Sequence, residues 1–423
     1  MRQIKWFSKA GRAAVALLVL LAGISIPSRS ARADFVEGWG LNSYGQLGNG
    51  TTASSNTPVA VSSLAGGVTA VAAGGNHSLA IQNGGAYAWG ENNGGQLGNG
   101  TLTNSSAPVA VSGLSSGVVA VAGGGAHSLA IQNGGVYAWG LNNNGQLGNG
   151  TTTGSGTPGA VSGLSSGVTA IAAGASHSLA IQNGQVYAWG GNTNGEIGNG
   201  TYNNYTTTPA PVSGLTIGVT AVAAGNVDSF AIQSGGLYAW GGNTNGELGN
   251  GSLSQADRPV PVTFLSTGVT SVAAGAAHSL AVKGGEVYAW GWNAFGQLGD
   301  GTTTSESDPE EVDPTDLSNI VAVAAAAQSS YALSSDGTIW DWGYNGDGEL
   351  GLGTTTSEYL TPQHVLPPSG YVFTSIDADA DGFAAIATLT PVPEPSAMAL
   401  LAFGGFATLQ RKRRPSQQSP ERG

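Results

Sequence analysis

The pattern of apolar and polar residues in this chain repeats at intervals close to 50 residues. One copy occupies residues 127–150, where apolar runs alternate with segments rich in Gly and Asn. A period of this length is typical of a β-propeller or a solenoid. A Trp-Gly pair marks every copy, at intervals of 50, 50, 50, 51, 50 and 52 residues, and the tryptophans are Trp39, Trp89, Trp139, Trp189, Trp240, Trp290 and Trp342.

Within one copy, four short apolar runs predict four β-strands. Two of them, Leu129–Gln132 and Val136–Trp139, are separated by Asn133-Gly134-Gly135. This sequence favours a tight hairpin, because both turn positions need a positive φ. Two more runs, Ala107–Ser112 and Val118–Ala122, precede the hairpin and are bounded by Gly, Ser or Pro. Four strands in each repeat are typical of a propeller blade.

The two ends of the repeat region complement each other. The first Trp-Gly strand, Phe35–Gly40, has no His-Ser-Leu-Ala strand before it, and the last copy of that strand, Asp381–Ile386, has no Trp-Gly strand after it. Pairing these two strands would complete a blade and remove an open sheet edge. We therefore predict an all-β fold, a seven-bladed β-propeller with four-stranded blades, closed by pairing of the N- and C-terminal strands.

Residues 1–33 are predicted to be a secretory signal peptide, and the propeller is predicted to span residues 34–389. A basic segment is followed by the apolar run Ala13–Ile26 and by a small-x-small cleavage site formed by Ala31 and Ala33. The mature protein should then begin after this site. A retained membrane anchor is less favoured, because the run is shorter than the ~20 residues that a membrane-spanning helix needs.

Residues 390–423 form a C-terminal tail of a different kind. Pro393, Glu394 and Pro395 are followed by the apolar run Ala397–Leu409 and by the basic cluster Arg411–Arg414. This order resembles the bacterial Pro-Glu-Pro C-terminal sorting signal. The resemblance implies recognition and cleavage by an exosortase-type processing enzyme, with only transient membrane contact through the terminal segments. The sequence leaves open whether the tail is cleaved or retained.

The repeats resemble the regulator of chromosome condensation repeat family, whose Trp-Gly-x-Asn-x-x-Gly-Gln-Leu-Gly pattern is present at Trp89–Gly98 and Trp139–Gly148. The resemblance implies a seven-bladed propeller, but a fold does not determine a function. In the eukaryotic namesake the propeller exchanges nucleotide on a small GTPase at chromatin, and an exported chain would reach neither. A secreted bacterial relative that inhibits a β-lactamase implies that the family's surface can bind proteins.

The charge of the predicted propeller argues against nucleic acid and anionic membranes as partners. Residues 34–390 contain 23 Asp and Glu but only two basic residues, Arg258 and Lys283, which gives a formal net charge of −21. Phosphate groups are bound by clusters of Lys and Arg, and this segment has no such cluster. The chain also has no cysteine, which excludes disulfides, thiolate nucleophiles and cysteine metal sites.

Four histidines occupy one position of the repeat, and we do not expect them to bind a metal. Neighbouring blades should lie about 10 Å apart, whereas the ligands of one ion must lie within a few ångströms of each other. We expect each imidazole to hydrogen-bond the backbone inside its own blade. The position holds His77, His127, His177 and His278, and in the other repeats Asp228, Ser329 and Asp381.

Asp377, Asp379, Asp381 and Gly382 match the beginning of a calcium-binding loop. Thr388 stands where such a loop needs a bidentate carboxylate, so a closing strand is the preferred interpretation and calcium is the alternative. The sequence has no His-Glu-x-x-His motif and no carboxylate pair set apart from the repeat. We therefore expect no catalytic residue, no metal, no cofactor and no enzymatic activity.

Aromatic residues that depart from the repeat in the loops after the Trp-Gly strands are the best candidates for ligand binding. They come from repeats that ring closure makes neighbours. Residues 301–390 of the same sector carry 14 acidic and no basic residues, six of them between 306 and 316. Scattered surface aromatics, and carboxylates that only maintain solubility, are the alternatives to one binding patch. The candidates are Tyr44, Trp292, Phe295 and Tyr344.

These observations favour an exported cell-surface or extracellular interaction module, a monomer that binds an extracellular protein without catalysis. Carbohydrate binding, or a structural role in the extracellular matrix, is the alternative, and a glycan would then be the partner. The sequence identifies neither the ligand nor the face of the propeller that binds it.

Overall fold

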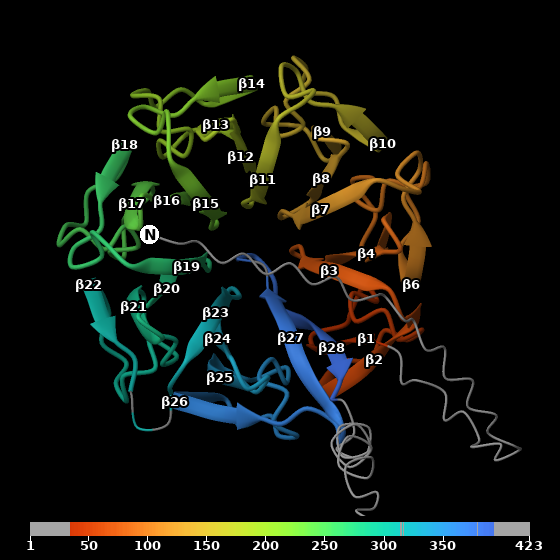
Figure 1. Ribbon diagram of the computed structural model, residues 1–423, viewed down its shortest axis with the longest axis vertical. Coiled ribbons are helices and arrows are strands. Elements are labelled where there is room, and N and C mark those ends of the chain that lie inside the picture. The colour runs from red at the N-terminus through yellow and green to blue at the C-terminus, as the bar shows by residue number, and fades with distance from the viewer. Residues whose placement is uncertain (1–33, 314, 316, 379, 393–423) are drawn as a thin grey trace, which may run out of the picture. The chain divides into compact units, whose positions relative to one another are not determined.

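Residues 34–392, except 314, 316 and 379, are described by the computed structural model, and all regular elements in these ranges are β-strands (Figure 1). The predicted signal cleavage site at Ala31 and Ala33, and the motif Pro393, Glu394 and Pro395, lie outside the described residues. No helix within the described ranges is long and apolar enough to cross a bilayer.

The strands form seven sheets of four antiparallel strands, arranged as the blades of a propeller (Figure 1). Blade 1 contains β27 (Tyr371–Ala378), β28 (Ala384–Pro391), β1 (Phe35–Gly40) and β2 (Ser55–Ala65). Blade 2 contains β3 (Val68–Ala73), β4 (His77–Gln82), β5 (Gly85–Gly90) and β6 (Ser105–Ala110). Blade 3 contains β7 (Val118–Gly123), β8 (His127–Gln132), β9 (Gly135–Gly140) and β10 (Ser155–Ala160). Blade 4 contains β11 (Val168–Ala173), β12 (His177–Gln182), β13 (Gln185–Gly191) and β14 (Tyr205–Pro211).

The remaining blades follow the same order, from the strand nearest the centre to the strand at the rim (Figure 1). Blade 5 contains β15 (Val219–Ala224), β16 (Asp228–Gln233), β17 (Gly236–Gly241) and β18 (Ala256–Pro261). Blade 6 contains β19 (Val269–Ala274), β20 (His278–Lys283), β21 (Glu286–Gly291) and β22 (Glu306–Glu311). Blade 7 contains β23 (Ile320–Ala325), β24 (Ser329–Ser334), β25 (Ile339–Tyr344) and β26 (Glu358–Val365).

The tryptophans of the repeat fill the core between neighbouring blades. Trp139 of blade 3 is fully buried in one cluster with Leu79 and Leu97 of blade 2. Its indole Nε1 donates a hydrogen bond of 2.8 Å to the Gln96 carbonyl of blade 2. A buried indole needs an acceptor for its N–H, and the neighbouring blade supplies it. Trp139 therefore joins blade 3 to blade 2.

The histidines also join neighbouring blades. His278 Nε2 lies 2.9 Å from the Ser330 hydroxyl oxygen of the next blade. That hydroxyl donates its only hydrogen to the Gln297 carbonyl, 2.7 Å away, so the imidazole must be the donor in the first bond. The expected bond to the backbone of the same blade is therefore wrong, because the side chain points at the seam between blades. The same bond, 2.8 to 2.9 Å long, joins His77 to Ser128, His127 to Ser178 and His177 to Ser229.

The predicted ring closure is confirmed. In blade 1 the strand order is β27, β28, β1 and β2, so both ends of the described chain contribute to one sheet. β1 pairs with β28 from Phe35, opposite Leu389, to Gly40, opposite Ala384. Blade 1 therefore has no strand edge left open at the joint between the two ends.

The register at the joint differs from the prediction. In blade 2 the repeat histidine, His77, lies opposite Gly90. In blade 1 the residue opposite the equivalent Gly40 is Ala384, so the expectation that Asp381 occupies the histidine position is wrong. The connection between β27 and β28 is two residues longer than the one between β3 and β4, and this insertion shifts the register.

The two faces of the ring carry different connections. The loop face holds the connections after the first and third strands of each blade, such as residues 74–76 and 91–104 in blade 2. The hairpin face holds the connections after the second and fourth strands, such as residues 83–84 and 111–117. β1 begins and β28 ends at the hairpin face. The described chain therefore enters and leaves the propeller on that side.

Candidate binding surface

Three of the four predicted aromatic residues form one continuous row on the loop face. The rings of Trp292 and Phe295 lie 5.5 Å apart at an interplanar angle of 89°. The rings of Phe295 and Tyr344 lie 5.2 Å apart at 71°. The first two belong to blade 6 and the third to blade 7, so the row crosses a seam. We call these three residues, together with Phe383, the aromatic row.

Phe383 extends the row into blade 1. Its ring lies 6.3 Å from that of Tyr344 at an angle of 74°. The sequence predicts Phe383 inside the closing strand, but β28 begins at Ala384 and Phe383 lies in the loop before it. The repeat could have pointed to Phe383 as a candidate for ligand binding, because the residue before the second strand is aromatic in blade 1 alone. The other blades have Asn76, Ala126, Ser176, Val227, Ala277 and Gln328 at this position.

A backbone hydrogen bond that recurs in the repeat positions these side chains. The residue after each Trp-Gly pair donates its N–H to the carbonyl of the residue before the second strand of the same blade. This bond is 3.0 Å long from Tyr344 to Gln328 and 2.9 Å long from Leu41 to Phe383. Equivalent side chains therefore leave the loop face at equivalent places, and neighbouring blades bring theirs together.

The structure does not bring Tyr44 into the row. Tyr44 and Phe295 occupy the same repeat position, five residues after their tryptophans. Phe295 of blade 6 contacts Tyr344 of the following blade. Gly94 holds the same position in blade 2, and a Cβ placed on it would lie 3.5 Å from Leu141 of blade 3, which is again the following blade. Tyr44 of blade 1 therefore faces blade 2, away from blade 7. In the part of the chain that the structure describes, no ring contact joins it to the row.

The rings of the row are half-buried and hold one another in place. Each edge-to-face pair contributes about 0.5–1.5 kcal/mol beyond the area that it buries. The backbone of the row is fixed as well, because the N–H of Phe295 donates a hydrogen bond of 2.9 Å to Gln297 Oε1. Since neighbouring rings are nearly perpendicular, the row offers no flat platform. It presents ring edges and ring faces in alternation.

Negative charge lies close to the row. The pKa of the Tyr344 hydroxyl is raised, first by burial and then by the nearby Glu349 and Asp347 carboxylates. Glu349 is fully buried, and its Oε2 accepts a hydrogen bond of 2.9 Å from the Asp347 N–H. Asp347 itself is exposed. A partner that approaches Tyr344 therefore meets the Asp347 carboxylate at the surface and the buried carboxyl group of Glu349 beneath it.

Of the acidic segment between residues 306 and 316, only the first part lies near the row. Glu306 begins β22 at the loop face, and the strand runs antiparallel to β21 until Glu311 lies opposite Tyr288. Asp313 follows at the hairpin face, about 20 Å from Glu306 at about 3.3 Å per residue. Asp316 lies outside the described residues. The second half of the connection therefore lies apart from the row.

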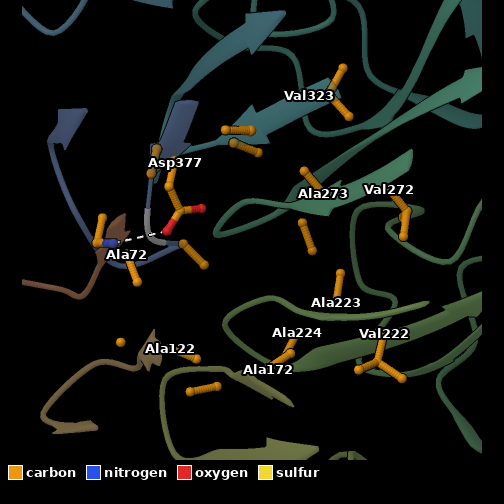
Figure 2. A pocket seen from close by; sticks show the side chains of 18 of the residues that line it. Ala72, Ala122, Ala172, Val222, Ala223, Ala224, Val272, Ala273, Val323 and Asp377 are labelled. Carbon is orange, nitrogen blue, oxygen red and sulfur yellow. Dashed lines mark hydrogen bonds between the residues drawn. The ribbon is translucent and has the colours of Figure 1, made fainter. Parts of the chain in front are cut away.

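The centre of the ring contains a hollow of about 300 Å³ lined by the inner strands (Figure 2). Its lining is Ala, Gly, Val and Ile, and Asp377 is the single carboxylate among the lining residues. Asp377 Oδ2 accepts a hydrogen bond of 2.9 Å from the Ala73 N–H of blade 2. Burial raises the pKa of Asp377 to about 6, although the N–H groups of Ala73 and Ala378 lower it in part. Asp377 therefore ties blade 1 to blade 2.

Metal binding at the predicted calcium loop stays untested, because Asp379 lies outside the described residues. Among the residues that are described, no group of three His, Asp or Glu side chains is placed to hold a metal ion. Asp377 accepts its bond from blade 2, whereas Asp381 points toward blade 3, where its Oδ2 would lie 2.7 Å from a Cβ on Gly125. The two carboxylates are therefore directed at different blades.

The Gly-x-Ser-x-Gly spacing of hydrolase nucleophiles occurs at residues 113–117 and 163–167. Both copies are mostly exposed turns between the last strand of one blade and the first strand of the next. The nucleophile elbow needs a sharp turn from a strand into a helix. These copies are therefore turn sequences and carry no catalytic signal.

Sequence profiles of known families match most of the chain. The Regulator of chromosome condensation (RCC1) repeat matches residues 38–81, 83–131, 133–181, 183–232, 234–282, 284–333 and 336–385. A second profile of the same repeat matches residues 68–96, 118–146, 168–196 and 269–297. The PEP-CTERM protein-sorting motif matches residues 391–414. No curated protein matches the chain significantly in sequence.

Solved structures share the fold. The crystal structure of human WBSCR16 has 25% sequence identity and a TM-score of 0.75, and the match covers 85% of this chain and 100% of that chain. A structure of Prp20p from Saccharomyces cerevisiae has 22% identity and a TM-score of 0.75, over 89% of this chain and 96% of that one. A structure of Kap60 bound to yeast RCC1 (Prp20) has 20% identity and a TM-score of 0.75, over 94% and 99%.

Proposed function

The chain belongs to the regulator of chromosome condensation (RCC1) repeat family, and we propose that it binds a protein partner through the aromatic row, without catalysis. Its PEP-CTERM motif indicates export and surface association in bacteria, and it implies processing by an exosortase. Yeast Prp20 has been crystallised in complex with Kap60, and its binding to Gsp1p and histones has been characterised. Protein binding by a propeller of this fold supports an interaction role for this chain.

The observation that carries the proposal is the departure of the row from the repeat. Trp292 and Tyr344 occupy a position where the fold accepts small, aliphatic or charged residues, because the same backbone bond forms in the other blades. The fold therefore does not need the aromatic rings. Half-buried aromatic side chains are the anchors that protein interfaces use. The other blades have Leu41, Glu91, Leu141, Gly191 and Gly242 at this position.

The place of the row on the propeller also supports this function. The described chain enters and leaves at the hairpin face, and the row lies on the loop face. The described ends of the chain therefore lie on the face opposite the row. A surface-associated propeller held by its C-terminal segment would present the row to a partner on the far side.

Carbohydrate binding is the second candidate, and one observation favours it. Trp340 and His364 stack with ring centroids 4.5 Å apart at an angle of 24°, unlike the rings of the row. They line a hollow of about 460 Å³ together with the polar side chains of Asp313, Thr361 and Gln363. Stacked rings next to amide, hydroxyl and carboxylate groups suit a sugar ring.

The test of the proposed function is site-specific photo-crosslinking on cells that display the protein. A photoreactive residue at Ala294, exposed between Trp292 and Phe295, should yield a protein adduct. The adduct should disappear when Trp292→Leu and Tyr344→Leu are introduced, since Leu is native to this position in other blades. The same photoreactive residue at Tyr205, exposed on blade 4, is the control. Equal adducts from both positions would count against the row.

A glycan array separates the second candidate from the first. If the protein binds no carbohydrate, wild type should bind no glycan of the array in a way that depends on Trp340. Trp340→Tyr restores the residue that five other blades have at this position, and it should keep the fold. Glycan binding that is lost in Trp340→Tyr and retained in Trp292→Leu would favour carbohydrate recognition at the hollow instead.

A further inference from the structure

The carboxylates beside the aromatic row come from two neighbouring blades. In blade 6, Glu306 lies opposite Gly291, next to the first ring of the row. In blade 7, Glu358 lies opposite Tyr344. Asp347 is exposed in the loop after Tyr344, close enough for its charge to act on the phenol. Acidic side chains therefore stand along the row on both sides of the seam that it crosses.

Neither basic residue of the described chain reaches the row. Arg258 lies in β18 of blade 5, where its guanidinium approaches Gly200 of blade 4. Lys283 ends β20 at the hairpin face, and its Nζ donates a hydrogen bond of 2.9 Å to the Phe264 carbonyl. The carboxylates beside the row therefore have no cation from the described residues to pair with.

We propose that the partner segment that docks on the aromatic row carries arginine or lysine side chains. This inference rests on the proposed function and specifies the chemistry of the partner. Aromatic faces attract cations, and a guanidinium on the face of Trp292 or Tyr344 would lie beside a carboxylate of the same blade. The carboxylates would steer such a segment to the row and repel an acidic one.

The dimensions of the row fit a short extended segment. Its ring centroids are 5.5, 5.2 and 6.3 Å apart in order along the row. About five residues of extended chain, at about 3.3 Å each, span the whole row. Because side chains alternate in direction along an extended chain, two or three of them would reach the rings. A basic residue at alternate positions is therefore the expected pattern.

The test uses random dodecapeptides displayed on phage, selected on the full chain immobilised through its C terminus. Peptides are kept when they fail to bind the variant with Trp292→Leu and Tyr344→Leu. The proposal predicts that the retained peptides are enriched in Arg and Lys. The tightest peptide should bind about tenfold more weakly to a variant with Glu306→Gln, Asp347→Asn and Glu358→Gln, a loss of about 1.4 kcal/mol.

Matched controls make each outcome decisive. Asp313→Asn with Asp336→Asn removes two carboxylates at the hairpin face and should leave binding unchanged. Retained peptides that are neutral or acidic would overturn the inference about charge while leaving the proposed function in place. If every peptide selected on wild type binds the Leu variant equally well, so that none is retained, the proposed function itself would be overturned. A synthetic peptide of residues 409–416 that binds the row more tightly than every retained peptide would identify the chain's own basic segment as the occupant. The inference of a basic segment from a partner would then be overturned.

Discussion

The imidazole Nε2 of His278 donates a hydrogen bond of 2.9 Å to the Ser330 hydroxyl across the seam between blades 6 and 7. Burial lowers the pKa of His278 to about 3, below the ordinary value of 6.5, so the folded state holds a neutral imidazole. The buried neutral imidazole contributes fully to the stability of the fold above pH 6.5. The contribution is lost as the pH falls below that value, because the unfolded chain then takes up a proton that the folded chain refuses.

Removal of the serine partner at this seam should cost more than removal of an equivalent serine elsewhere. Ser330→Ala leaves the buried His278 N–H without an acceptor, which costs about 1–3 kcal/mol. Ser279→Ala is the control, since Ser279 bonds only the Glu247 carbonyl and the histidine position at its seam is occupied by Asp228. We expect Ser330→Ala to lower the unfolding free energy by about 1 kcal/mol more than Ser279→Ala in urea titrations. Equal losses would show that the imidazole bond contributes little.

Substitution of Glu349 should stabilise the fold in a pH-dependent way. Glu349 is buried, its Oε1 has no partner among the described residues, and burial raises its pKa from 4.5 to about 7. The folded chain thus keeps a proton that the unfolded chain releases, so wild-type stability falls as the pH rises from 4.5 to about 7. Glu349→Gln should raise the unfolding free energy at pH 8 by about 2 kcal/mol and change it little at pH 5. A gain of the same size at both pH values would refute this reading. Four other blades already have glutamine here, at Gln46, Gln96, Gln146 and Gln297.

Ring closure should make folding of the whole propeller depend on its first strand. β1 lies between β28 and β2 in blade 1, so its removal leaves β2 without a partner and exposes one edge of β28. A chain truncated to residues 50–389 should melt over a broader range and at a lower temperature than one of residues 34–389. Calorimetry of the two chains decides the point. A truncated chain that melts as sharply as the longer one would show that closure is dispensable.

The repeat explains why the fold was predictable and why part of the surface was not. The Trp-Gly strand and the Asn-Gly hairpin recur in the sequence, and both ends of the chain carry half of one blade, so the seven-bladed ring follows from local signals. The partner of each histidine did not follow, because Ser330 lies 52 residues after His278 and in another blade.

The aromatic row could be predicted only in part, because departures from the repeat are visible in the sequence but contacts between blades are not. Trp292 and Tyr344 stand out from the repeat by residue type alone. Phe383 was missed because the longer β27–β28 connection moves it out of the strand where the alignment placed it. The direction of Tyr44 could not be predicted, because sequence alone does not show that this repeat position packs against the following blade.

Processing at both ends should be visible in the mass of the mature protein. If both terminal signals act, the protein recovered from the cell surface should begin at Asp34 and lack Arg411–Arg414. Intact-mass measurement of protein from cells with and without an exosortase tests this. An unchanged tail on the surface protein would count against sorting by the C-terminal motif.

The most direct test of the central claim is an equilibrium binding measurement on the aromatic row. Fluorescence anisotropy of the tightest peptide selected on wild type alone, before any peptide is discarded for its binding to a variant, would be followed with three proteins. These are wild type, a variant carrying Trp292→Leu and Tyr344→Leu, and a variant carrying Tyr202→Ser and Tyr205→Ser. We predict that the first variant binds at least about 30-fold more weakly, which corresponds to about 2 kcal/mol, while its melting temperature stays close to that of wild type. The second variant, altered at exposed tyrosines of blade 4, should bind as wild type does. Equal affinity of the first variant and wild type, or equal losses in both variants, would contradict the assignment of the binding surface to the row.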